Sequence, residues 1–293
     1  MRLILLLAAL ALPAGLVSGC GSEDLGSVSA AEAAAATRDA ETARIELTMA
    51  IKGGGFPQPV EITAEGVTAT KGLETDVTID FGPVLESFGA GGDGKTRVLS
   101  DGRDVFVDPP AVEGLDLPGG ATWVTADLAE VAEAAGIDVA GLGELMRVST
   151  EQQLASLEAA NAVEKVGEEE IDGEDTVRMK GTVTFDDYFR SLSPQRRARV
   201  QKLIDQIAAL PGGGDVRKEL DRPTPIELWV DGDDRVRRIR QESRIPAQQG
   251  VPAGSFVMTM DYTDFGTDLD IDRPEGDEVW DATEQLKKLL PKP

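Results

Sequence analysis

Several stretches of this chain alternate between apolar and polar residues with a period of two, and this pattern constrains the fold most strongly. Every second residue is apolar from Ile45 to Ile51, from Val77 to Phe81 and from Phe256 to Tyr262. A period of two is that of a β-strand with one face buried. Parallel strands, which are buried on both faces, read instead as continuous apolar runs. The alternation therefore predicts an antiparallel sheet with one apolar face.

Further predicted strands extend this sheet through both halves of the chain. They are Val98 to Val107, Thr122 to Thr125, Val177 to Phe185 and Ile226 to Val230. Asp101-Gly102 and Asp231-Gly232 are turn dipeptides that mark where strands reverse.

Helices interrupt the strands at a few places. Ser193, Pro194 and an apolar i, i+3, i+4, i+7 repeat from Val200 to Ile207 predict a helix that stops at Pro211-Gly212. Other predicted helices are Asp127 to Ala135, Ser149 to Ala160 and Ala282 to Leu290. No internal boundary stands out, so we expect one α+β domain: a curved antiparallel sheet with helices on one side.

The charge and the missing residue types exclude several function classes. The chain has 29 basic and 53 acidic residues, a formal charge of −24, so a nucleic-acid backbone would be repelled. It has no histidine, which removes imidazole bases, His-activated nucleophiles and His-ligated zinc. We therefore expect no catalytic residue, cofactor or metal, and no nucleic-acid partner.

The single cysteine lies at the end of a bacterial export leader. Met1-Arg2 is a basic start, Leu3 to Leu12 is apolar, and Val17 to Cys20 resembles a lipobox, in which the cysteine is acylated after cleavage. We expect residues 1–19 to be a lipoprotein signal peptide, residues 20–36 a lipidated tether and residues 37–293 the folded domain. Ala30 to Ala40 is an alternative helix because it is rich in alanine. Lipidated Cys20 would anchor the protein to the outer face of the cell membrane.

Two motifs, one glycine-rich and one acidic, resemble ligand-binding loops. Gly89 to Thr96 fits the nucleotide-binding pattern G-x-x-x-x-G-K-[ST], but the residues that follow alternate as a strand, whereas a phosphate loop needs a helix there. Asp268 to Asp272 begins like a calcium loop, but Arg273 and Val279 stand where glycine and glutamate are required. We interpret both as loops, with a looser calcium site at the second as the alternative.

A basic row on the Pro194 helix has two interpretations. Arg196, Arg199 and Lys202 share one side of it in an acidic protein. They could contact anionic lipid head groups, or they could form the solvated face of an ordinary packed helix.

The second half of the chain resembles a lipoprotein family in a series of short motifs. They are Leu154-x-x-Leu157, Ala160, Val163, Val166-Gly167-x-x-x-Ile171-Asp172-Gly173-Glu174-x-Thr176-x-Arg178, Glu227-Leu228-Trp229-Val230-Asp231 and Val236-x-Arg238. This run resembles the actinobacterial LppX/LprA/LprG-type lipoproteins, which are similar in fold to the Lol lipoprotein carriers. The resemblance implies a half-open antiparallel β-barrel whose concave face, closed by helices, holds the acyl chains of a lipid or glycolipid, without a catalytic motif.

The alternation supplies the residues of this expected cavity. They are Leu47, Met49, Ile51, Val77, Ile79, Phe81, Val177, Met179, Val183, Phe185, Leu228, Val230, Phe256, Met258 and Met260. Unbranched methionine suits a site for variable acyl chains, although plain core is the alternative. The leading hypothesis is a membrane-anchored envelope protein that carries or presents an acylated lipid or glycolipid. An envelope sensor that binds another protein through the same fold comes second, and a hydrolase third.

Overall fold

The computed structural model describes residues 29–89, 92–102, 104–109, 117–127, 130–131, 163–209, 222–245 and 252–289. The strands are β1 Thr42–Gly53, β2 Val60–Ala69, β3 Glu74–Asp80, β4 Lys95–Asp101, β5 Val105–Asp108, β6 Trp123–Thr125, β7 Glu164–Ile171, β8 Glu174–Val183, β9 Thr224–Val230, β10 Val236–Ile245, β11 Gly254–Thr263 and β12 Val279–Asp281. The helices are α1 Ala30–Asp39, α2 Gly82–Ser87, α6 Phe185–Ser191, α7 Pro194–Ala209 and α9 Thr283–Leu289, with 3-10 turns at Pro118–Gly120 and Gly276–Glu278.

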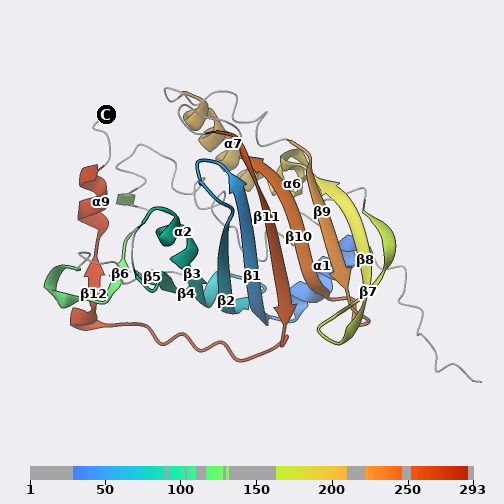
Figure 1. Cartoon of the computed structure of the whole chain (residues 1–293), viewed down its shortest axis with the longest axis horizontal. Coiled ribbons are helices and arrows are strands. Elements are labelled where there is room, and N and C mark those ends of the chain that lie inside the picture. The colour runs from blue at the N-terminus through green and yellow to red at the C-terminus, as the bar shows by residue number, and fades with distance from the viewer. Residues whose placement is uncertain are drawn as a thin grey trace, which may run out of the picture.

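All twelve strands belong to one unclosed sheet, which twists across the molecule (Figure 1). Their order is β12-β6-β5-β4-β3-β2-β1-β11-β10-β9-β8-β7. Neighbouring strands are antiparallel, except that β12 pairs with β6 in parallel. The predicted fold class, a curved and largely antiparallel sheet with a few helices, is confirmed.

The register sorts the side chains of the sheet onto two faces, because directly paired residues point to the same side. One row of paired residues crosses eight strands and consists of Met179, Leu228, Ile239, Met260, Leu47, Ala64, Ile79 and Thr96. We call the face that carries this row the inner face. The opposite, outer face carries the charged and hydroxyl side chains of the same strands. The alternation in the sequence is thus the record of one apolar and one polar face.

Helix α1 packs on the inner face, at the end of the sheet where β1 begins. Ser29 caps it together with Glu32, and Ala33 and Ala34 are completely buried in the same core cluster as Tyr262. Ala30–Asp39 is therefore a core helix, as in the alternative interpretation, and not the end of a tether. The core of the described residues therefore includes α1, which lies before residue 37, and alanine is small enough to bury its side of a helix closely against a sheet.

Helix α7 confirms the predicted Pro194 helix, but its apolar side packs on another helix. Val200 and Ile204 form a buried cluster with Leu192, and Phe185 and Phe189 of α6 pack against it. Phe185 is thus the first residue of α6 and not the end of a strand, since β8 stops at Val183. Packing against this helix-helix cluster explains why residue 185 is apolar although strand β8 has already ended at Val183.

A short helix also replaces the end of the predicted strand at Phe81. Strand β3 stops at Asp80, and Phe81 is the N-cap of α2. The Phe81 N–H donates to Gly94 O at 2.8 Å. Gly94 has φ +67° and a Cβ there would lie 2.1 Å from Gly82 N, so only glycine allows the chain to pass this close.

Other local predictions have clear outcomes. The turn predicted at Asp101-Gly102 joins β4 to β5, the turn predicted at Asp231-Gly232 joins β9 to β10, and α9 occupies the last predicted helix. The residues after the glycine run form strand β4, as the alternation predicted. The signal peptide, Cys20, the predicted helix Ser149 to Ala160 and most of the one from Asp127 lie outside the described residues.

Candidate functional site

The apolar side chains of the inner face are buried over one part of the sheet and half-buried over another. On β8, β9 and β10 they are closed off from solvent, and Leu228, Val230 and Ile239 are completely buried. On β1, β2 and β3 the equivalent apolar side chains keep part of their surface exposed: Leu47, Met49, Ile62, Ala64, Val77 and Ile79. The half-buried part, which we call the β1–β3 trough, is continuous with the core cluster through Leu47 and Val77.

The structure brings thirteen of the fifteen predicted cavity residues to the inner face. Eight are buried: Ile51, Val177, Met179, Val183, Leu228, Val230, Met258 and Met260. The other five are half-buried: Leu47, Met49, Val77, Ile79 and Phe256. Phe81 and Phe185 lie on helices, as described above. Of the four methionines among these predicted residues, Met179, Met258 and Met260 are core and Met49 is half-buried.

One polar side chain at the margin of the trough has no partner. Thr96 pairs with Ile79 across β3 and β4, so its side chain lies on the inner face. It is 5 % exposed, and its hydroxyl makes no hydrogen bond. A buried hydroxyl without a partner costs about 1–3 kcal/mol. The hydroxyl of Thr96 is thus a buried polar group beside the trough whose hydrogen-bonding capacity is unused.

The predicted basic row lies on α7, at the end of the sheet where β1 turns into β2 (Figure 1). Arg199 and Lys202 are exposed, and Arg196 is half-buried. Val200, Leu203 and Ile204, on the other side of the helix, are buried. The placement fits both a solvated helix face and a head-group contact.

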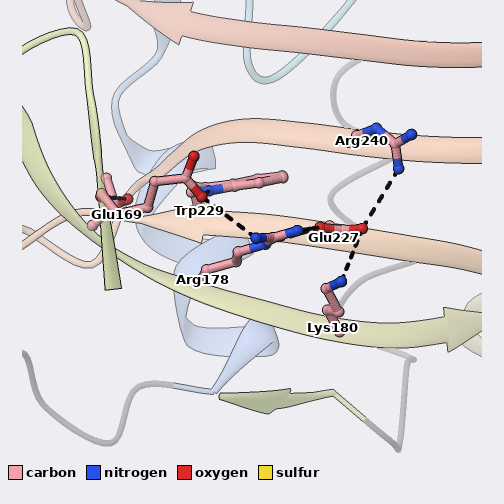
Figure 2. Close-up of polar contacts among 7 residues, drawn as sticks. Glu169, Arg178, Lys180, Glu227, Trp229 and Arg240 are labelled. Atoms are coloured by element: carbon pink, nitrogen blue, oxygen red, sulfur yellow. Dashed lines mark hydrogen bonds and ion pairs between the residues drawn. The ribbon is translucent and has the colours of Figure 1, made fainter. Parts of the chain in front are cut away.

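Sequence reasoning missed a charged cluster on the outer face of β7 to β10. Glu227 of β9 lies between Arg178 and Lys180 of β8 and Arg240 of β10, which approach it from different sides (Figure 2). A hollow of about 410 Å³ opens here, lined by Glu169, Arg178, Glu227, Trp229, Arg238, Arg240 and Thr259. We call it the outer-face pocket.

The two oxygens of Glu227 have unequal partners. Oε2 accepts hydrogen bonds from Nε of Arg178, at 2.9 Å, and from its Nη2. Oε1 has longer contacts, 3.3 Å to Nζ of Lys180 and 3.5 Å to Nη1 of Arg240. Burial alone would raise the pKa of Glu227, but the hydrogen bonds from Arg178 and Lys180 outweigh it and hold the pKa below its ordinary value.

Trp229 forms the floor of this pocket. It is 4 % exposed because two guanidinium groups cover its ring, Arg178 at 5.2 Å and Arg238 at 5.9 Å from the ring centroid. Its indole N–H donates to Oε2 of Glu169 at 3.0 Å. Arg238 also holds Asp261 through Nε and Nη2, and this hydrogen bonding raises the pKa of Arg238. The ring fixes two cations in place by cation–π contacts.

The described residues hold no group of three or more acidic or cysteine side chains arranged to bind a metal ion. In the Asp268 segment, Arg273 reaches back to pair with Asp101 and Asp104. None of the helices in the described part of the chain has the length and apolar character needed to cross a bilayer.

Comparison with known proteins gives distant matches. No family model matches the chain. A Streptomyces griseus protein, described as an uncharacterized 31.2 kDa protein in the rplA-rplJ intergenic region, is 25 % identical over 200 residues. The match covers 68 % of this chain and spans 60 % of the length of that relative.

Two solved structures of mycobacterial lipoproteins are similar to this one. LppX of Mycobacterium tuberculosis has a TM-score of 0.41 and 14 % identity, covering 82 % of this chain and 94 % of its own. LprF of Mycobacterium bovis has the same TM-score and identity, covering 84 % and 95 %. LppX is one of the lipoproteins that the sequence motifs resemble. At TM-scores of this size the neighbours assign no ligand, so the function is argued from this chain's own residues.

Proposed function

We propose that this protein is an envelope lipoprotein that binds an acylated lipid or glycolipid in the β1–β3 trough and carries or presents it without a covalent step. The observation that carries the proposal is the row of half-buried apolar side chains on β1 and β3, continuous with a closed core. A sheet that only had to fold would bury this surface as fully as the neighbouring half does. The lipobox at Cys20 supports a position at the membrane, where such a ligand is available.

The energetics favour an acyl chain as the occupant. Each CH₂ group removed from water contributes about 0.8 kcal/mol, so a chain of roughly sixteen carbons contributes about 12 kcal/mol before ordering costs. Met49, which is unbranched, can adapt to chains of different shape.

The test is to measure bound lipid on the protein from Gly21 onward, purified from an actinobacterial host. Native mass spectrometry followed by solvent extraction should show a stoichiometric acyl lipid. The double variant Leu47→Gln/Met49→Gln places two amides in the trough and should lower lipid occupancy several-fold. Glu46→Gln/Thr48→Gln is the matched control, because it changes the alternate residues of the same strand, on the outer face.

The outcomes separate the alternatives. Both variants should give thermal unfolding curves close to that of the parent, since the changed side chains are half-buried or exposed. A parent protein that is free of lipid and takes up none of the added phospholipids or glycolipids would refute the proposal. That result would favour a sensor that binds another envelope protein.

A further inference from the structure

We infer that the outer-face pocket binds a phosphoryl group, through Arg240 of its lining and Lys180 at its margin, beside Glu227, with Arg178 behind them. The pocket lies on the side of the sheet opposite to the β1–β3 trough. The inference therefore goes beyond the proposed lipid-binding function and stands or falls separately.

Positive charge is concentrated in this pocket although the chain as a whole is strongly acidic. Four cations lie in two neighbouring cross-strand rows of β8, β9 and β10. One row pairs Arg178, Trp229 and Arg238, and the other pairs Lys180, Glu227 and Arg240. The ion-pair partners of these cations are Glu169, Glu227 and Asp261, so the ion-paired groups carry 4 − 3 = +1. Glu164, which pairs with Lys180 across β7 and β8, borders the cluster on one side. The whole chain carries −24. A surplus of cations in an acidic protein is the electrostatic requirement for an anion site.

The excess of positive over negative side chains is greatest around Glu227. This one carboxylate faces three cations, and only one of them, Arg178, makes short hydrogen bonds to it. Lys180 and Arg240 share the other oxygen at 3.3 and 3.5 Å, which is long for charge-assisted hydrogen bonds. Their side chains remain 47 % and 36 % exposed. An incoming oxyanion could take over these two donors while Glu227 keeps its hydrogen bonds to Arg178.

The shape of the pocket favours a tetrahedral oxyanion. Lys180 and Arg240 lie on opposite sides of Glu227, on β8 and β10, so their donors converge on a ligand from two directions (Figure 2). The hydroxyl of Thr259, which pairs with Arg240 across the sheet, adds a donor on the same lining. The hollow of about 410 Å³ has room for a phosphoryl group together with part of the molecule that bears it. Because Trp229 holds Arg178 and Arg238 from below, these cations are in place before the ligand arrives.

Trp229 also provides a direct readout. With Trp123→Phe and Trp280→Phe in the full domain, its fluorescence reports the pocket alone. Inorganic phosphate, titrated at constant ionic strength against potassium chloride, should produce a saturable change. Lys180→Gln/Arg240→Gln should weaken binding at least tenfold, since each cation donates a charge-assisted hydrogen bond. Arg97→Gln should bind like the parent, because Arg97 is an outer-face arginine paired with Asp76 on β3.

A second variant makes the test independent of folding defects. Glu227→Gln removes the competing carboxylate but keeps its size, so it should bind phosphate several-fold more tightly than the parent. A protein that merely lost its fold cannot gain affinity. The inference is overturned if the parent shows no saturable response, or if Glu227→Gln and Lys180→Gln/Arg240→Gln both bind as the parent does.

Sedimentation with vesicles distinguishes the source of the phosphoryl group. Binding to phosphatidylglycerol vesicles and not to phosphatidylcholine vesicles, lost in Lys180→Gln/Arg240→Gln, supports an anionic lipid head group as the ligand. Binding of inorganic phosphate without vesicle binding supports a soluble phosphorylated molecule. Vesicle binding that survives in Lys180→Gln/Arg240→Gln, without any response to phosphate, overturns the inference.

Discussion

Thr37 ties helix α1 to the sheet through one buried hydroxyl. Its Oγ1 donates to Ala33 O at 2.8 Å and accepts from the backbone N–H of Val236, the first residue of β10, at 2.7 Å. Thr37 and Val236 are both completely buried. Thr37→Val keeps the shape and the β-branch but leaves the Val236 N–H without a partner in the core.

The cost of this change follows from the burial. An unsatisfied buried donor costs about 1–3 kcal/mol, and threonine and valine differ little in helix propensity. We therefore expect Thr37→Val to lower the free energy of unfolding by about 2 kcal/mol. For a domain of this size that corresponds to a fall in Tm of about 4–8 °C.

Urea unfolding followed by far-UV circular dichroism measures the loss. Thr63→Val is the matched control, since Thr63 is exposed on the outer face of β2, and it should change stability by less than about 0.5 kcal/mol. If Thr37→Val is as stable as this control, the hydroxyl does not hold α1 on the sheet and the reasoning is wrong.

Two further predictions concern charge and anchoring. The folded protein holds the pKa of Glu227 below its ordinary value. Its ion pairs therefore stabilise the fold above that ordinary value, and this stabilisation is lost as the pH falls through the lowered pKa. When Tm is measured against pH, Glu227→Gln should show a smaller fall in Tm at acidic pH than the parent. An equal fall in both proteins would contradict the role given to the Glu227 ion pairs. Cys20→Ser should move the full-length protein from the membrane fraction to the soluble fraction of an actinobacterial host, and retention at the membrane would rule out acylation at Cys20 as the anchor.

Much of the sheet could be predicted because burial of one face leaves a period of two in the sequence. This holds for β1, β3 and β11. Strand β7 was missed because it is an edge strand whose residues are mostly exposed, so Glu164 to Glu170 shows no apolar alternation. Strand β2 was missed although Val60, Ile62 and Ala64 alternate, because Gly66 continues their face without a side chain.

The outer-face pocket could not be predicted from the pattern. Its cations lie on the polar side of their strands, where sequence reasoning sees an ordinary solvated face. Lys180 and Glu227 are far apart in the chain and meet only through the register of β8 against β9. Alternation indicates which face a residue occupies, but pairing between strands that are distant in sequence decides which residues become neighbours.

If the protein is anchored through Cys20 as proposed, the position of α1 limits how far the domain can move from the bilayer. With Cys20 as the anchor, the tether to Ala30, the first residue of the helix, is ten residues long. At about 3.6 Å per residue it can extend to at most about 36 Å. Strand β1 alone, with 12 residues, is about 40 Å long. The far end of the sheet can therefore touch the same membrane only if the domain lies on its side. The proposed cargo would have to pass to a neighbour within the length of the tether plus the length of the domain.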